Sequence, residues 1–214
     1  GQDSESDEQF VKLWCAQRAV QFYSVQFDTK NKAAEWKKGI QETARILRYE
    51  WFEQIRSHHH YSRIATAHHA NDNLETLLIN LFKGTGISGL HGILSENGNV
   101  IRPLLFATKD MISAYAGANE VVFREDVSNA SDDYLRNAVR HKIVPVVKEL
   151  FPNAETNVSE SIVRFAQAEQ IFMRAIETVR KKMLEHRGQD VYLPIRKFIQ
   201  QPQRETLCYE LFRP

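Results

Sequence analysis

Two spacings of hydrophobic residues alternate along the first 150 residues of the chain. Apolar side chains recur every three or four residues in four segments, and this spacing predicts helices over 5–18, 40–57, 72–83 and 109–118. Short runs rich in β-branched, aromatic and other apolar residues predict strands at 20–27, 63–67, 100–104 and 120–123. Strands that alternate with helices are typical of an α/β fold, so we expect a mostly parallel sheet with helices on both faces.

The last third of the chain has a purely helical spacing. A stripe through Leu135 and Ile143 predicts a helix that Pro145 must kink or end, because proline lacks an amide proton and its ring collides with the preceding turn. No proline or glycine occurs from Ala154 to Arg187, so we expect one long helix that Gly188 ends. The pattern divides the chain into an α/β domain, a long linker helix and the start of a second helical domain, over 1–150, 151–188 and 189–214.

Composition narrows the class of protein. The 214 residues are 43% hydrophobic and 26% charged, which is enough to bury a full core. There is neither an apolar run long enough for a membrane span nor a basic-then-apolar secretion signal in the first residues, so we expect a cytoplasmic protein without a membrane partner. Two isolated cysteines, Cys15 and Cys208, are too few for a disulfide framework or a cysteine-based zinc site.

The net charge of +1 lacks the strongly basic balance of many nucleic-acid-binding proteins. Contact with RNA would therefore use local basic patches, for which the other interpretation is a solvated helix face. The candidates are Arg136, Arg140, His141 and Lys142, and then Arg180, Lys181, Lys182 and Arg187.

The segment from His68 to Thr76 carries the densest group of chemically useful side chains. It joins a predicted strand to a predicted helix, and ligands of α/β proteins bind at the carboxyl ends of strands and at helix starts. A helix that begins at Asp72 places Glu75 on the same side, with His68 in the preceding turn. Such a cluster could hold magnesium with nucleotide phosphates, orient an amine or move protons. The alternative is that Asp72 and Glu75 only cap the helix.

Two pairs of arginines have helical spacing. Arg45 and Arg48 lie three residues apart, and Arg136 and Arg140 lie four apart, so each pair can project from one helix face. The planar guanidinium fork donates two parallel hydrogen bonds to a phosphate, which makes these pairs candidate phosphate ligands. Surface ion pairs are the alternative explanation.

Two further motifs have plainer explanations. The GTGISG segment with Gly84, Gly86 and Gly89 matches a dinucleotide fingerprint in its letters, but it follows a helix instead of a strand, so we reject that function. We expect a helix exit at which the backbone turns, with amides that could face RNA or a substrate. Three consecutive histidines, 58–60, point in different directions and cannot easily share one zinc ion, so we expect a polar loop there.

Six segments, taken in order, resemble one known family. They are DSESDEQF (3–10), IQETARILRYEWF (40–52), TAHHANDNLET (66–76), KGTGISG (83–89), IRPLL (101–105) and EDVSNASDDYLRNAVRH (125–141). Their order and sequence are similar to those of the tRNA(Ile)-lysidine synthase family, which belongs to the N-type ATP pyrophosphatases or PP-loop proteins. The resemblance covers about residues 1–150 and is weaker beyond them.

This resemblance implies a ligase that uses ATP and modifies an isoleucine tRNA. ATP would adenylate the 2-carbonyl oxygen of the cytidine at the wobble position and release pyrophosphate, and the side-chain amine of free lysine would then displace AMP. His68 and Asp72 would be the catalytic residues, with Asp72 as a Mg²⁺ ligand and with Asp72 and Glu75 as carboxylates for the lysine. The residues that would bind substrate or nucleotide are Arg45, Arg48, Asn71, Glu75, Arg136, Asn137 and Arg140, with the loop of Gly84, Gly86 and Gly89 near the substrate. The resemblance leaves a homodimer open.

The chain departs from the family pattern at two places. The family's SGGxDS pyrophosphate loop is absent from the sequence, so we expect an amino-terminal strand, loop and helix and a carboxyl-terminal domain outside this chain, which should not turn over ATP unaided. Asn71 and Asn73 replace an aspartate and a glutamine of many members, which changes the expected set of metal ligands. The rival functions are another PP-loop tRNA-modifying enzyme that thiolates cytidine, although this chain has no CxxC pair, and a noncatalytic RNA-binding module on the same scaffold.

Overall fold

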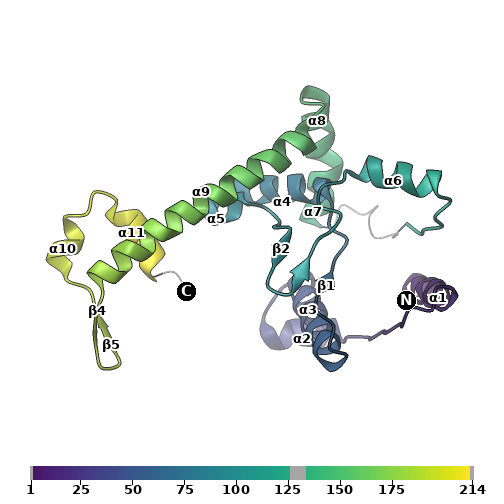
Figure 1. Cartoon of the computed structure of the whole chain (residues 1–214), viewed down its shortest axis with the longest axis horizontal. Coiled ribbons are helices and arrows are strands. Elements are labelled where there is room, and N and C mark those ends of the chain that lie inside the picture. Colours follow the sequence, from purple (N-terminus) through teal and green to yellow (C-terminus); the bar gives the residue numbers. More distant parts are fainter. Residues whose placement is uncertain (1, 126–133, 213–214) are drawn as a thin grey trace.

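The computed structural model describes residues 2–125 and 134–212. A small sheet lies among helices, and one long helix runs from this body to a small carboxyl-terminal unit (Figure 1). The elements are α1 (Gln2–Gln17), α2 (Thr29–Trp36), α3 (Ile40–His58), β1 (Ile64–Ala65), α4 (Ala70–Lys83), α5 (Ile87–Leu90), β2 (Glu96–Asn97), β3 (Val100–Ile101), α6 (Lys109–Ala118), α7 (Leu135–Ala138), the π-helix η2 (Val139–Ile143), α8 (Val144–Leu150), α9 (Ala154–Met183), β4 (Glu185–Arg187), β5 (Asp190–Tyr192), α10 (Ile195–Ile199) and α11 (Arg204–Phe212). Residues 126–133, most of the first half of the sixth matching segment, lie outside the described residues.

The helices predicted from periodicity are present, and α6 has the predicted bounds. Helix α4 begins at Ala70, two residues before the expected start at Asp72. The Oδ2 atom of Asp72 accepts a hydrogen bond of 2.9 Å from the backbone N–H of His69, which precedes the helix. Asp72 therefore caps the helix as predicted, but as the third residue of a box that begins at His69. Glu75 takes no part in this cap and pairs with Arg140 instead.

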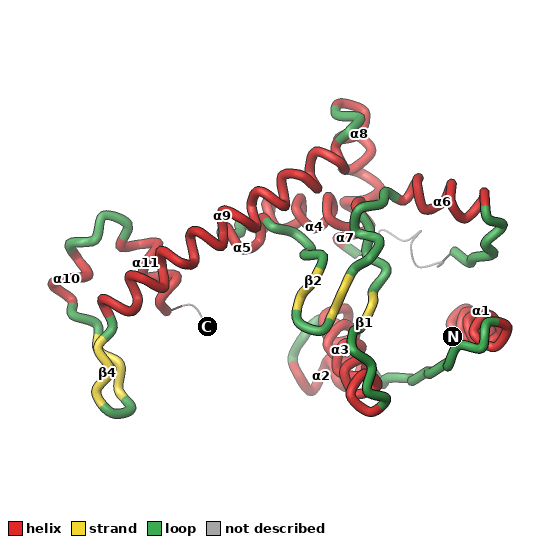
Figure 2. The backbone as a smooth tube through the Cα atoms, viewed as in Figure 1, coloured by secondary structure: helices red, strands yellow, loops and turns green. Residues whose placement is uncertain are grey.

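The sheet contains three short strands in the order β1-β3-β2. Strand β1 is parallel to β3, and Ala65 pairs with Ile101, whereas β2 is antiparallel to β3. The α/β class is present, but a mostly parallel sheet is not confirmed, because one of the two strand pairs is antiparallel. The tube in Figure 2 shows how little of the body is strand.

Two of the predicted strands are wrong. Residues 20–28 and 121–125 have no strand assignment in the structure. Both segments contain apolar and aromatic residues, but a strand also needs a neighbour with which it exchanges backbone hydrogen bonds. The composition of a segment shows which side chains it carries, but it does not show whether a second strand lies beside it.

Pro145 does not end the helical segment of the last third. The chain passes from α7 through the π-helical turn η2 into α8, and Pro145 stands in the first turn of α8. A proline is tolerated there because the first amide groups of a helix need no partner within the helix. The π-helical turn η2 is wider than an α-helical turn, and it joins α7 to α8 without a break in the helical segment.

The hydrophobic core lies where α4, η2, α8 and α9 meet. Its buried members are Leu74 from α4, Val139 from η2, Val144 from α8 and Ala154 from α9. Leu74 is 1% exposed, so the first turns of α4 are held firmly by this core. The core thus fixes the helix that follows the His68 segment.

The long helix ends earlier than predicted. It stops at Met183, and residues Glu185–Arg187 pair with Asp190–Tyr192 in an antiparallel hairpin. Gly188 lies in the turn of this hairpin with a φ of 67°, so it serves a β-turn and does not cap the helix. None of the helices in the described ranges has the length and apolar character needed to cross a membrane.

Candidate functional site

A cleft of about 840 Å³ opens at the carboxyl end of β1, between α3, the first turn of α4 and α7. Helices α3, α4 and α7, strand β1 and the connection after β1 supply its lining, which consists of Gln41, Glu42, Ala44, Arg45, Arg48, Tyr49, Phe52, Ala65, Thr66, Ala67, His68, Asp72, Arg136 and Asn137. Six of these were predicted as site residues from the sequence, namely Arg45, Arg48, His68, Asp72, Arg136 and Asn137. The cleft therefore joins residues that lie up to 96 positions apart in the chain, from Gln41 to Asn137.

His68 stands in the connection between β1 and α4. Its Nδ1 atom lies 2.9 Å from Oγ1 of Thr66, which orients the imidazole ring. Burial lowers the pKa of His68 below its ordinary value, the neighbouring guanidinium groups of Arg102 and Arg136 lower it further, and Asp72 acts in the opposite direction. The ring is therefore neutral at physiological pH and can accept a proton.

Asp72 lies at the floor of the cleft. Its side chain is 12% exposed, and its second carboxylate oxygen, Oδ1, lies 3.6 Å from Nη2 of Arg140. One oxygen is thus used by the backbone N–H of His69, while the other faces a guanidinium at a distance too long for a hydrogen bond. Oδ1 therefore interacts with Arg140 through charge and without a hydrogen bond.

Glu75 is buried beneath the cleft and does not line it. Arg140 donates two hydrogen bonds to its carboxylate, from Nε at 2.6 Å and from Nη2 at 3.0 Å. These bonds raise the pKa of Arg140 above its ordinary value. Nε of Arg136 lies 3.8 Å from the same carboxylate, and Nη2 of Arg136 donates to Oγ1 of Thr76 at 2.6 Å. Glu75 therefore positions both arginines, and its carboxylate is already occupied.

Asn71 faces away from the cleft. Its side-chain amide donates to Oε1 of Glu155 at 3.1 Å, and its Oδ1 atom accepts the backbone N–H of Lys109 at 2.8 Å. These bonds tie α4 to α6 and α9, so the structure gives Asn71 an architectural role. The neighbouring Asn73 accepts the backbone N–H of Ile93 at 2.6 Å in the same way.

The glycine loop lies at the other end of α4. A helix of 14 residues is about 21 Å long, so Gly84 is far from the cleft that begins before Ala70. Gly84 has a φ of 75° and ends the helix, and a Cβ at Gly89 would collide with the side chain of Thr85. The predicted helix exit is confirmed, and Gly84, Gly86 and Gly89 are absent from the lining of the cleft.

Sequence reasoning missed two groups that shape the cleft. Thr66 holds the imidazole of His68, and its position two residues earlier on an extended segment, on the same face, is the signal that could have found it. Tyr49 is the second missed residue. The centre of its ring lies 5.3 Å from the guanidinium carbon of Arg45, four residues earlier on α3. This cation–π contact holds Arg45 at the wall of the cleft.

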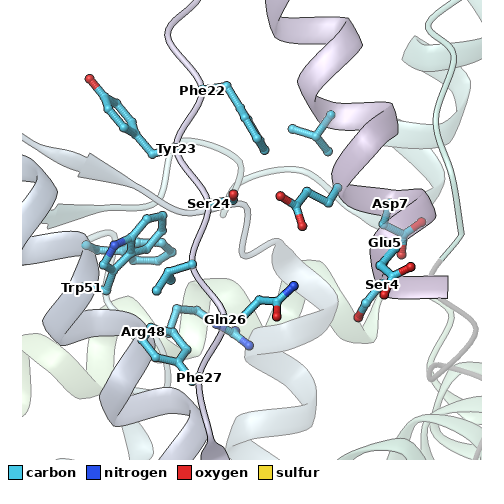
Figure 3. A pocket seen from close by; sticks show the side chains of 14 residues that line it. Ser4, Glu5, Asp7, Phe22, Tyr23, Ser24, Gln26, Phe27, Arg48 and Trp51 are labelled. Atoms are coloured by element: carbon cyan, nitrogen blue, oxygen red, sulfur yellow. The ribbon is translucent and has the colours of Figure 1, made fainter. Parts of the chain in front are cut away.

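Arg48 borders a second cavity of about 710 Å³ between α1, the segment 22–27 and α3. Figure 3 shows Arg48 and Trp51 on one side of this space and Glu5 and Asp7 of α1 on the other. Because Arg48 lines both cavities, the basic wall of the cleft continues towards the acidic first turns of α1.

The described residues do not build a metal site of their own. No group of three or more histidine, cysteine, aspartate or glutamate side chains among them could hold a metal ion. The cleft contains two carboxylates, Asp72 and Glu42, and Glu42 is hydrogen-bonded to Lys38 at 2.6 Å. Three arginines face them, so the cleft favours an anion over a bare cation.

Comparison with known proteins shows which family the sequence matches. Residues 1–147 match the model of the PP-loop domain family. The chain is 46% identical over 151 residues to a tRNA(Ile)-lysidine synthase of Chlorobaculum tepidum, covering 71% of this chain and 46% of that protein. It is 36% identical over 213 residues to the synthase of Parabacteroides distasonis, covering 100% of this chain and 48% of that protein. The synthase of Thermosipho africanus is 37% identical over 165 residues, which are 77% of this chain and 38% of that protein. The chain spans about half the length of the first two of these relatives.

Proposed function

Because the chain belongs to the PP-loop domain family, we propose that it forms the ATP-using part of a tRNA(Ile)-lysidine synthase. The enzyme would be a ligase that joins free lysine to the wobble cytidine of an isoleucine tRNA, and its place would be the cytoplasm, where that tRNA is found. The convergence of His68, Asp72 and Arg136 in one cleft at the end of β1 carries this proposal. Similarity to named synthases over the full chain supports it.

The arginines of the cleft would bind the phosphates of ATP. Arg45, Arg48 and Arg136 supply fork-shaped donors from two different helices. Negative charge builds up on the transferring phosphoryl group and on the leaving pyrophosphate when the cytidine oxygen attacks, and guanidinium groups stabilise that charge. Glu75 holds Arg136 and Arg140 in place before substrate arrives, which reduces the cost of organising the site.

The second step requires a neutral amine. The side chain of free lysine has a pKa of about 10.4 and arrives as an ammonium ion, so a base must remove a proton before the nitrogen can attack. Oδ1 of Asp72, which makes no hydrogen bond to Arg140, would attract the ammonium group, and the neutral imidazole of His68 would accept the proton. The nitrogen then forms a bond to C2 of the activated cytidine, and the bond between C2 and the adenylated oxygen breaks to release AMP.

Magnesium would enter these steps bound mainly to the phosphates of ATP and to water, as it usually is in nucleotide-binding proteins. Asp72 is the candidate protein ligand, because its carboxylate lines the cleft in which the phosphates would bind. The other groups that this chain would contact are the phosphates, the lysine amine and the tRNA.

Thiolation of cytidine receives no support from the cysteines. Cys15 is buried in α1, and Cys208 is exposed on α11 at the other end of the molecule (Figure 1). Neither lines the cleft, so neither is placed to carry sulfur to a substrate bound there.

The test is an incorporation assay with the full-length protein. Labelled lysine, ATP and an isoleucine tRNA transcript with cytidine at the wobble position should give labelled tRNA, with AMP and pyrophosphate released in equal amounts. A transcript with uridine at that position is the matched control and should remain unlabelled. ATP-dependent sulfur transfer, or tRNA binding without AMP release, would contradict the proposal.

A further inference from the structure

Arg102 follows the last residue of β3 at the same edge of the sheet as the cleft. Ala65 pairs with Ile101, and the backbone N–H of Thr66 donates to the carbonyl of Ile101 at 3.0 Å, so Thr66 and Arg102 occupy equivalent positions on adjacent parallel strands. Side chains at paired positions lie on the same face of a sheet. Thr66 lines the cleft, and Arg102, which is buried and not part of the lining, lies next to Thr66 on the adjacent strand.

The guanidinium of Arg102 is buried and incompletely bonded. The residue is 8% exposed, its Nη1 atom donates to the carbonyl of Leu94 at 2.7 Å, and its backbone N–H donates to the carbonyl of Ser95 at 2.9 Å. Its Nε atom is buried and has no hydrogen-bond partner among residues 2–125 and 134–212. None of the ion pairs found in those ranges involves Arg102.

Three other arginines of this region have counter-ions. Arg140 and Arg136 lie against Glu75, and Arg63 pairs with Glu96 at 2.9 Å. A buried guanidinium without a carboxylate loses its hydration and gains no Coulomb attraction in return. A ligand that supplies the anion restores this attraction. Ligands of α/β proteins bind at the carboxyl ends of parallel strands, which is where Arg102 lies.

We propose that Arg102 is an oxyanion-binding residue of the cleft and that its Nε–H group donates to a phosphate or carboxylate oxygen of a substrate. This inference rests on the proposed function only for the two sources of that oxyanion, the phosphates of ATP and the α-carboxylate of lysine. The guanidinium also acts on His68, whose pKa it lowers, which agrees with a position close to the reacting groups.

Substitution of Arg102 distinguishes a role in ligand binding from a structural role in holding the carbonyl of Leu94. Arg102→Met keeps the bulk of the side-chain stem, and Arg102→Lys keeps the charge but loses the Nε donor. Equilibrium binding of a non-hydrolysable ATP analogue and of lysine to the full-length protein, together with both KM values, gives the readout. Arg63→Met is the matched control, because Arg63 is exposed and its partner is an exposed glutamate.

We expect Arg102→Met to lower the affinity for one of the two ligands by about ten-fold or more. Arg102→Lys should lower the affinity for the same ligand to a smaller extent, and Arg63→Met should change neither affinity. Weaker ATP-analogue binding assigns the phosphate, and weaker lysine binding assigns the carboxylate. Unchanged affinity and KM for both ligands in folded variants would overturn the proposal.

Loss of the fold is also decisive. If Arg102→Met does not fold, Arg102→Lys carries the measurement, and loss of the fold in both variants assigns Arg102 to bracing the Leu94 carbonyl and overturns the inference. Binding is measured apart from lysine transfer. A protein that binds both ligands with Arg102 but transfers no lysine would therefore contradict the proposed function alone.

Discussion

Arg140 holds the carboxylate of Glu75 with two hydrogen bonds of 2.6 and 3.0 Å, across 65 positions of the chain. Glu75 is 1% exposed, so this pair connects η2 to α4 inside the protein. The same carboxylate attracts Arg136, which lines the cleft. The wall of the candidate site is thus fixed by a buried acid that the substrate does not need to touch.

The first prediction concerns the stability of this pair. Replacement of Glu75 by Gln leaves the Arg140 guanidinium partly buried without its counter-ion, and we expect the free energy of unfolding to fall by about 3 kcal/mol. Urea denaturation measures the change. Glu160→Gln is the control, because Glu160 pairs with Arg164 on the exposed face of α9 and should cost only about 0.5 kcal/mol. Equal effects of the two substitutions would show that the buried pair contributes no more than a surface pair.

Asp72 has a chemical role that can be separated from its role at the start of α4. Asp72→Asn keeps a side-chain oxygen for the backbone N–H of His69 and removes the negative charge. We expect lysine transfer to fall by about a hundred-fold or more, with the unfolding free energy within about 1 kcal/mol of the unsubstituted protein. Steady-state transfer rates and urea denaturation check the two parts. Near-normal transfer would remove Asp72 from the mechanism.

Periodicity predicted α3, α4 and α6 because each has an apolar stripe, whereas α2 was not predicted from its polar sequence. The stripe through Leu74, Leu77 and Leu78 identified α4, and Leu74 proved to be among the most buried side chains. The same reasoning could not predict whether the segment 20–27 has a strand beside it, since that depends on distant parts of the chain. The hairpin β4–β5 was missed because no helix breaker precedes Gly188.

The candidate site was predictable where its residues are neighbours in the sequence. His68 lies in the connection from β1 to α4 and Asp72 in the first turn of α4, and the structure brings both into the cleft. The partners of polar side chains were not predictable in the same way. Asn71 bonds to Lys109 and Glu155, and Glu75 bonds to Arg140, all through contacts that exist only after the chain has folded.

The third prediction uses the pKa of His68. Burial holds it below the ordinary value of about 6.5, so the acid limb of the lysine-transfer pH profile should lie below that pH if the neutral ring is the base. His68→Gln should slow transfer and remove this limb, while Thr66→Val, which removes the hydroxyl at Nδ1, should keep the limb and lower the rate less. An unchanged limb in His68→Gln would assign it to another group.

The lowered pKa of His68 also makes the free energy of unfolding depend on pH. Because the folded protein lowers the pKa of His68, the unfolded chain binds its proton more readily. The contribution of the neutral ring is therefore complete above the unfolded pKa of about 6.5 and is lost as the pH falls towards the lower, folded value. Urea denaturation at a series of pH values should show that His68→Gln loses less stability on acidification than the unsubstituted protein does.

The last prediction separates the glycine loop from the cleft. Gly84 has a φ of 75°, a conformation that an L-residue with a side chain adopts only with strain, so Gly84→Ala should lower the unfolding free energy by about 1 kcal/mol. Gly117→Ala is the matched control, since Gly117 lies inside α6 with open space at its Cβ position and should become slightly more stable. Because Gly84 lies at the end of α4 remote from His68, affinity for the ATP analogue should not change in Gly84→Ala. A large loss of ATP-analogue affinity with intact stability would place the loop at the nucleotide, and a loss of tRNA affinity alone would assign its exposed amides to the RNA.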